Sequence, residues 1–368
     1  MAAPSTSARS TVSAESSALQ RRALLLSSLG LALPAGASVR QLDHRARLWA
    51  FEQQLPALMT ELKVPGLALL LLQDGQPAWS ACQGHGGGPE RKPVGQSTVF
   101  ELASMSKPVF AWLATQLVRS GQLQLDRPIV EILPRPFETV QAGQERITPR
   151  MLLSHQSGLP NWRAGGDDAP LLLQAVPGER FIYSGEGYYL LQQLVEKVTG
   201  LPLQALAERE LFKPLGMDSS TFVWRPTLDA RRAWGHDDAG LALPRQDYAR
   251  ANSAYTLYSS LDDYGRFLAA MLRPDYGSAM LVPQVKAGDR EPLVRPEPAR
   301  GREVNWGLGW VLDETAQGRI AYHSGSNSTG YRSYCQFSVQ RGSALLMLSN
   351  GLGGGKLWRR LAATLGDL

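Results

Sequence analysis

Apolar and polar positions in the N-terminal part of the chain predict a helix followed by a β-hairpin. Two apolar runs, 67–72 and 78–82, flank the dipeptide Asp74-Gly75, which is typical of a two-residue hairpin turn. Residues 42–62, which precede the hairpin, carry apolar side chains at helical spacing. We therefore expect a helix over 42–62 that packs against the sheet to which the hairpin belongs.

Helical periodicity dominates the middle of the chain. Thr148 followed by Pro149 is typical of a helix start, with an N-cap residue before a proline at the first helical position. Gly158 and Pro160 are expected to end this short helix. The helices predicted in this region cover residues 106–120, 148–158, 186–199 and 202–212.

The C-terminal third changes to short apolar runs joined by glycine-bearing turns, which predict an antiparallel meander. The expected strands cover 306–312, 320–323, 331–337 and 343–348, and a helix is expected over 356–365. Together these elements predict an α+β fold, an antiparallel β-sheet flanked by helices with an inserted, mainly helical domain. We expect the sheet domain to comprise 42–110 and 226–368, and the helical domain 111–225.

Residues 1–37 are predicted to be a secretory signal. Arg21 and Arg22 precede the apolar run 23–33, and Pro-Ala-Gly-Ala at 34–37 has the small-x-small form of a cleavage site. The arginine pair indicates the twin-arginine route, and the run is too short to span a bilayer. We expect an exported protein, periplasmic or secreted, with no stable membrane anchor. The alternative is a disordered tail with a surface helix.

Composition narrows the function classes. The 368 residues are 43% hydrophobic and 19% charged, with a net charge of +5, as in ordinary globular proteins. Lysines and arginines are scattered without a basic run, so nucleic-acid binding is not expected. Cys82 and Cys335 each lie in a short apolar stretch and are expected to be separate core thiols, although an oxidising compartment would allow them to pair. The pattern indicates no metal site, and it specifies no oligomeric state.

The sharpest chemical signal is Ser104, followed three residues later by Lys107. On a helix these positions share a face, so the lysine amine can reach the serine hydroxyl. A buried lysine loses its proton more readily and can act as the base that activates a serine nucleophile. Pro108 requires that the helix start only a few residues earlier, which places Ser104 at its positive end. The alternative is an N-cap serine followed by a solvated lysine.

Three further segments join this pair in a recognisable order. They are 148–160 (Thr-Pro-Arg-Met-Leu-Leu-Ser-His-Gln-Ser-Gly-Leu-Pro), 181–188 (Phe-Ile-Tyr-Ser-Gly-Glu-Gly-Tyr), and His-Ser-Gly-Ser at 323–326 followed by Gly-Tyr-Arg at 330–332. With 98–108, they resemble the serine β-lactamase-like family, which includes class C β-lactamases, related carboxylesterases and D-aminopeptidases. The resemblance runs from about residue 50 to 355 and implies a β-lactamase/transpeptidase-like fold.

The resemblance also implies roles for individual residues. Ser104 would be the nucleophile, Lys107 its partner, and Tyr183 a general base or a proton relay with the lysine. A phenol ionises near neutral pH only beside positive charge, which Lys107 would supply; the alternative is that Tyr183 is a core aromatic. His323 would hydrogen-bond the substrate or the tyrosine. The backbone N–H groups of Ser104 and Ser326 would stabilise the oxyanion, with the strand edge at Ser324 and Gly325 lining the site.

Two departures from the family pattern bear on the substrate. In β-lactamases the second motif is Tyr-x-Asn, whereas Gly185 stands here in place of the asparagine. The third motif begins with His323 where lysine is frequent, which weakens a fixed positive charge near pH 7. Both changes favour an esterase or a D-amino-acid peptidase over an efficient β-lactamase. A small ester or amide substrate is therefore expected, and no metal or organic cofactor is implied.

Alternatives to this hypothesis differ in their chemistry. His155 could serve as the base of a Ser-His pair, but a histidine that satisfies backbone groups in a loop is the favoured interpretation. The chain could also be a penicillin-recognising sensor that is acylated once without turnover. A catalytically inactive scaffold is the third alternative, and the presence of Ser104, Lys107 and Tyr183 together argues against it.

Overall fold

The computed structural model describes residues 2, 39–133, 136–166, 168–287 and 304–367. The chain divides into two compact units, residues 1–47 and 48–368, and the second contains the whole β-sheet. Apart from residue 2, the signal predicted over 1–37 lies outside the described residues.

The elements follow the order that the sequence predicts. The α-helices are α2 (Val39–Glu61), α3 (Ser106–Arg119), α4 (Pro149–Leu153), α5 (Gly185–Thr199), α6 (Leu203–Ala207), α7 (Lys213–Leu215), α8 (Leu261–Met271) and α9 (Gly354–Leu365). The strands are β1 (Gly66–Gln73), β2 (Gln76–Gly84), β3 (Phe100–Glu101), β4 (Tyr258–Ser259), β5 (Val285–Lys286), β6 (Val304–Trp306), β7 (Val311–Thr315), β8 (Gly318–Ser326), β9 (Arg332–Ser338) and β10 (Ser343–Ser349).

The N-terminal hairpin and the C-terminal meander share one eight-stranded sheet in the order β2-β1-β10-β9-β8-β7-β6-β5. Neighbouring strands in it are antiparallel, and β1 pairs with β10 from Leu67↔Ser349 to Gln73↔Ser343. The predicted α+β class is therefore confirmed. The hairpin turn is also confirmed, because Asp74 and Gly75 have φ values of 52° and 74°, as a type I′ turn requires.

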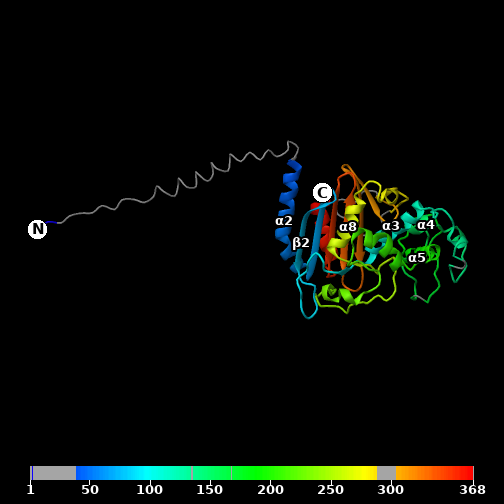
Figure 1. Cartoon of the computed structure of the whole chain (residues 1–368), viewed down its shortest axis with the longest axis horizontal. Helices are drawn as coiled ribbons and strands as arrows, with labels where there is room; N and C mark the ends of the chain where they lie inside the picture. The colour runs from blue at the N-terminus through cyan, green and yellow to red at the C-terminus, as the bar shows by residue number, and fades with distance from the viewer. Residues whose placement is uncertain (1, 3–38, 134–135, 167, 288–303, 368) are drawn as a thin grey trace. The chain divides into compact units, whose positions relative to one another are not determined.

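The two faces of β1 belong to two different cores. Leu67, Leu69 and Leu71 are buried with the apolar side chains of α9 and of residues 48–59, whereas Leu70 and Leu72 are buried with those of α8 and α3. This split follows from the period of two in a strand. Figure 1 shows α8 beside the strands, with α3, α4 and α5 beyond α8. The predicted domain limits at 111 and 225 stay a prediction, and α3 runs across the first of them.

Two element predictions need correction. A single strand was expected over 306–312, but β6 ends at Trp306 and β7 begins at Val311. Gly307 and Gly309 cause the break. A side chain at Gly307 would lie 2.2 Å from the carbonyl oxygen of Met280, and Gly309 has a φ of 89°, so both support a turn.

The helix predicted over 148–158 is also shorter than expected. It begins as predicted, with the Thr148 hydroxyl accepting a hydrogen bond from the Met151 amide, but it ends at Leu153. His155 has a left-handed backbone with φ 59°, which a right-handed helix cannot continue. The helix predicted over 202–212 comprises α6 and a π-helical turn, Glu208–Phe212.

Cys82 and Cys335 are both free thiols, as the sequence predicts. Cys82 lies on β2 and Cys335 on β9, with β1 and β10 between them. Strands are spaced about 4.8 Å apart, so this separation exceeds the Cα distance of about 4.4–6.8 Å that a disulfide needs. The sheet therefore keeps the two thiols apart.

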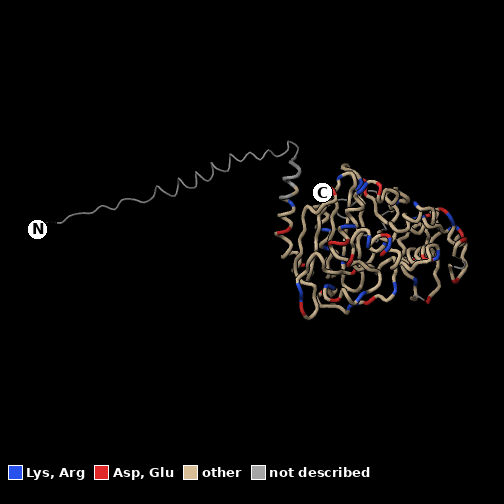
Figure 2. Tube along the Cα trace, in the orientation of Figure 1, with Lys and Arg blue, Asp and Glu red and all other residues tan. Residues whose placement is uncertain are grey.

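Charged residues of both signs are distributed along the described part of the chain. Figure 2 shows Lys and Arg interspersed with Asp and Glu along the trace, without a stretch of one sign. No helix within the described part of the chain has the length and apolar character that crossing a bilayer requires.

Strand β8 approaches the segment that precedes Ser104 through a glycine. A Cβ added at Gly325 would lie 2.1 Å from the carbonyl oxygen of Leu102 and 2.4 Å from the Ser333 hydroxyl, which itself donates to the Leu102 carbonyl at 3.2 Å. Real Cβ atoms do not make contacts this short. Glycine at 325 therefore lets the sheet lie directly against the Leu102–Ser104 backbone.

We predict that Gly325→Ala lowers the free energy of unfolding by about 1–3 kcal/mol, because the methyl group must push β8 away from Leu102. Chemical denaturation measures this change. Gly95→Ala is the matched control, since a Cβ there meets nothing within 4 Å, and its effect should stay within about 0.5 kcal/mol. Equal stability of Gly325→Ala and the parent would contradict the close approach.

Candidate active site

Ser104 is singled out by its exposure. Every residue from Val99 to Thr115 is buried except Ser104, which is half-buried. It lies in the 3-10 turn Ala103–Met105, which leads directly into α3. Ala103 has a φ of 47°, and strained backbone of this kind is often found at functional sites. The chain thus presents one hydroxyl to the surface at the start of a helix, as the sequence predicts.

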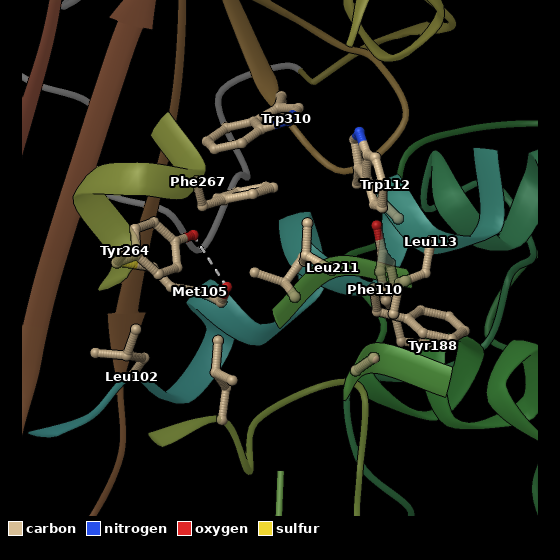
Figure 3. Packing of buried hydrophobic residues seen from close by; sticks show 14 of the residues in the cluster. Leu102, Met105, Phe110, Trp112, Leu113, Tyr188, Leu211, Tyr264, Phe267 and Trp310 are labelled. Carbon is tan, nitrogen blue, oxygen red and sulfur yellow. Dashed lines mark hydrogen bonds between the residues drawn. The ribbon is translucent and has the colours of Figure 1, made fainter. Parts of the chain in front are cut away.

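Hydrogen bonds from two distant segments hold this turn. The Ser106 hydroxyl donates to the Ala103 carbonyl at 2.6 Å and accepts from the Leu257 amide at 2.9 Å. Tyr264 of α8 donates from its hydroxyl to the Met105 carbonyl at 3.1 Å, as the dashed line in Figure 3 shows. Because both carbonyls flank Ser104, its backbone is fixed before any substrate binds.

Lys107 is completely buried and reaches Ser104. Its Nζ donates to the Ser104 hydroxyl at 3.3 Å and to the Ala254 carbonyl at 2.9 Å. Burial lowers the pKa of the Lys107 amine to about 7, because a low-dielectric interior disfavours the charged form. The structure therefore brings together the serine and the lysine, and gives the lysine a substantial neutral fraction at neutral pH.

Tyr183 also lies close to the lysine amine. Its ring centre is 4.7 Å from Lys107 Nζ, and the ring of Tyr188 is 5.6 Å away. Tyr183 is buried and follows the loop that leads into α5. Lys107 Nζ thus contacts the Ser104 hydroxyl and lies over the Tyr183 ring, and the proton-transfer role of the Tyr183 hydroxyl stays a prediction.

His323 is buried in the same aromatic surroundings. Its ring lies 6.4 Å from that of Tyr183, 5.7 Å from that of Trp306 and 6.5 Å from that of Trp310. Nδ1 is 2.8 Å from the Ser324 carbonyl, which can only accept, so the proton is assigned to Nδ1. Burial, together with the nearby Lys107 charge, lowers the pKa of His323 to about 3. The ring is therefore neutral at pH 7 and supplies no fixed positive charge.

The strand end at Ser324, Gly325 and Ser326 lies beside the nucleophile segment. These residues pair with Tyr334, Ser333 and Arg332 of β9. Gly325 approaches the backbone of Leu102 closely. Leu102 lies two residues before Ser104 in the sequence. The structure therefore places the 324–326 strand end beside the segment that contains Ser104, and the oxyanion role of the Ser104 and Ser326 amides stays a prediction.

Glu101 is a component that the sequence analysis missed. Its buried carboxylate accepts from Asn327 Nδ2 at 3.0 Å and from the Thr329 hydroxyl at 2.7 Å, and it pairs with Arg232 at 3.3 Å. Desolvation raises the pKa of Glu101, opposed by the hydrogen bond from Thr329. The carboxylate thus ties the chain just before Ser104 to the loop just after Ser326. Glu101 stands three residues before Ser104 in the sequence, but this spacing alone does not predict the contact.

Gly185 is the first residue of α5. Ser184 is the N-cap of this helix, and its hydroxyl accepts from the Gly187 amide at 2.8 Å. The Gly185 amide donates to Asn161 Oδ1 at 3.0 Å. A Cβ at Gly185 would lie 2.6 Å from the indole of Trp162. A neighbouring aromatic ring therefore occupies the space of a side chain at this position, and no local sequence pattern indicates this role of Trp162.

His155 has a structural role, in agreement with the favoured interpretation. It is fully buried, and its Nδ1 accepts a hydrogen bond from the Ser184 amide at 3.0 Å. Its ring lies 4.4 Å from that of Tyr183. Burial holds the pKa of His155 well below its usual value, so the neutral ring orients the loop that carries the tyrosine. Within the described ranges, no three His, Cys, Asp or Glu side chains are grouped to hold a metal ion.

Comparison with known proteins identifies a family and several relatives of this chain. The family model described as Beta-lactamase matches residues 51–367. Esterase EstB of Burkholderia gladioli is 27% identical over 86% of this chain and 93% of that protein. Penicillin-binding protein 4 of Amycolatopsis lactamdurans is 29% identical over 82% of this chain and 84% of that protein.

A solved structure described as a class C beta-lactamase superposes with a TM-score of 0.74, at 17% identity, over 88% of this chain and 97% of that one. This likeness supports the fold, while the family match spans nearly all of the chain that contains the sheet and the Ser104 site. The chain therefore belongs to the Beta-lactamase family, whose fold is that of serine hydrolases and penicillin-binding proteins.

Proposed function

We propose that this protein is a serine hydrolase that cleaves small esters or amides through an acyl-enzyme on Ser104. The observation that carries the proposal is the buried Lys107 amine, which lies 3.3 Å from the Ser104 hydroxyl and has a pKa lowered to about 7. A neutral amine at that distance is a base for the serine. The similarity to Esterase EstB over most of both chains supports the substrate class.

The proposed reaction has two steps. The Ser104 oxygen attacks the substrate carbonyl carbon while its proton passes to Lys107, with Tyr183 as relay to the departing alcohol or amine. The bond to the leaving group then breaks, and an ester on Ser104 remains. A water molecule gives its proton to the same base and attacks this ester, which releases the acid and restores the hydroxyl. The amides of Ser104 and Ser326 stabilise the oxyanion in both steps.

The neutral His323 and the side-chain-free Gly185 favour an esterase, or a peptidase for D-amino-acid substrates, over an efficient β-lactamase. His323 offers no fixed charge for a substrate carboxylate, because burial lowers its pKa to about 3. Gly185 offers no side-chain amide for the substrate. Both features lie beside Tyr183, where the acyl group would bind.

We predict that Ser104→Ala lowers kcat/KM for p-nitrophenyl acetate by about 10³-fold or more, because the variant lacks the nucleophile. Spectrophotometric assays and intact-mass analysis for an acyl adduct measure the effect. Ser97→Ala, at an exposed serine, is the matched control and should retain parental activity. Unchanged hydrolysis in Ser104→Ala would refute the nucleophile, and one equivalent of product without turnover would identify a sensor instead.

We predict that kcat/KM rises with pH through an apparent pKa of about 7 and is flat above about pH 8. The pKa of Lys107 is lowered to about 7, and only the neutral amine accepts the serine proton, so deprotonation increases the rate. His323 has finished titrating well below this range. Lys107→Arg stays charged and should abolish activity, whereas kcat/KM of the parent should rise with pH. A rate independent of pH between 5.5 and 8.5 would contradict this assignment.

We also propose that the protein is exported through the twin-arginine route, from the pattern of Arg21, Arg22 and the apolar run 23–33. The double variant Arg21→Lys, Arg22→Lys should accumulate inside the cell with its N-terminus intact. The parent should be found outside the cytoplasm and begin near residue 38. Cell fractionation with N-terminal sequencing decides this, and equal export of parent and variant would exclude the twin-arginine route.

A further inference from the structure

Trp162 is a large apolar side chain that remains exposed beside the site. It is 47% exposed, and its ring stands edge-on to that of Tyr255 with centres 5.4 Å apart and planes at 89°. Most tryptophans are largely buried, so an exposed one that is held in a fixed orientation suggests a contact surface.

Both neighbours of Trp162 are fastened to the start of α5. Asn161 accepts hydrogen bonds from the Gly185 amide, at 3.0 Å through Oδ1, and from the Glu186 amide, at 3.1 Å through its carbonyl. Arg163 donates from its amide and from Nε to the Glu186 carboxylate, both at 3.2 Å. Because the residues on either side are fixed to one helix end, the indole between them is held before any ligand binds.

Gly185 makes room for the indole. A Cβ at this position would lie 2.6 Å and 2.8 Å from two ring carbons of Trp162, distances that real atoms do not adopt. One face of the ring therefore lies against the backbone at the start of α5. The side chain leaves part of its surface open on the other side.

This ring lies between two segments that contact Lys107. On one side, Gly185 is two residues from Tyr183, whose ring is 4.7 Å from Lys107 Nζ. On the other side, Tyr255 follows Ala254, whose carbonyl accepts from Lys107 Nζ at 2.9 Å. The indole therefore contacts two segments whose adjoining residues reach Lys107, which places it near the Ser104 site.

We propose that Trp162 is the specificity-determining residue of the Ser104 site, and that it selects esters or amides whose acyl group carries an aromatic ring. An aromatic acyl group gains contact with the exposed indole. The acyl group reacts in both acylation and deacylation. A fixed surface that contacts the acyl group therefore orients it in both steps. The inference rests on the proposed function, because it requires Ser104 to be the acylated residue.

Two esters with the same leaving group test the proposal, p-nitrophenyl phenylacetate and p-nitrophenyl acetate. We expect the parent to prefer the phenylacetate, and Trp162→Ala to lower the ratio of the two kcat/KM values roughly tenfold, the factor that about 1.4 kcal/mol of aromatic contact produces. Trp162→Phe should keep most of the preference. Leu172→Ala is the matched control, since Leu172 is an exposed apolar residue at 50% exposure in the same loop region, and it should leave the ratio unchanged.

Two further measurements separate the possible failures. Inhibition by free phenylacetate relative to acetate should weaken about tenfold in Trp162→Ala, and thermal melting shows whether the variant is folded. If Ser104→Ala abolishes hydrolysis but Trp162→Ala leaves the ratio unchanged, the specificity role is refuted and the proposed function stands. If Ser104→Ala stays active, the proposed function itself fails. If Trp162→Ala instead loses activity toward phenyl acetate relative to methyl acetate, the indole contacts the leaving group. That result would overturn the acyl assignment.

Discussion

The site depends on the burial of one amine. Lys107 is fully enclosed, and its Nζ reaches a hydroxyl, a backbone carbonyl and an aromatic ring. A charged amine in such surroundings is costly unless it is paired, and no carboxylate is among these three contacts. The pKa therefore falls to about 7, and an ordinarily inert side chain becomes a base at neutral pH. The neutral histidines at 155 and 323 belong to the same low-dielectric region.

The rest of the fold keeps that amine aligned with Ser104. Tyr264 and Ser106 fix the carbonyls around the serine, and Gly325 allows β8 to lie against Leu102. Glu101 then joins the segment before Ser104 to the loop after Ser326. Sheet, turn and loop thus meet at one place, although the residues involved come from both ends of the sequence.

Sequence patterns predicted the elements that depend on local rules. The hairpin at Asp74 and Gly75, the cap at Thr148 and the pairing of Ser104 with Lys107 all follow from spacings of a few residues, and the structure contains each. The strand over 306–312 was wrong because Gly309 adopts a left-handed backbone and Gly307 lies against Met280. Periodicity contains no information on that contact.

The missed parts of the site come from long-range contacts. Ala254 contributes only a backbone carbonyl, which any residue supplies. Glu101 contacts Asn327, Thr329 and Arg232, all of which are distant in the sequence. Trp162 is placed by the missing side chain at Gly185. Local sequence patterns identify residues, but they do not give the distances between residues in different segments.

The most direct test is an NMR titration of Lys107 in protein with ¹³C-labelled lysine, assigned with Lys107→Arg. The carbon next to the amine should report a midpoint near pH 7, because burial lowers the pKa of Lys107 to about 7. A Lys107 midpoint near 10 would show a charged amine beside Ser104 and would contradict the account.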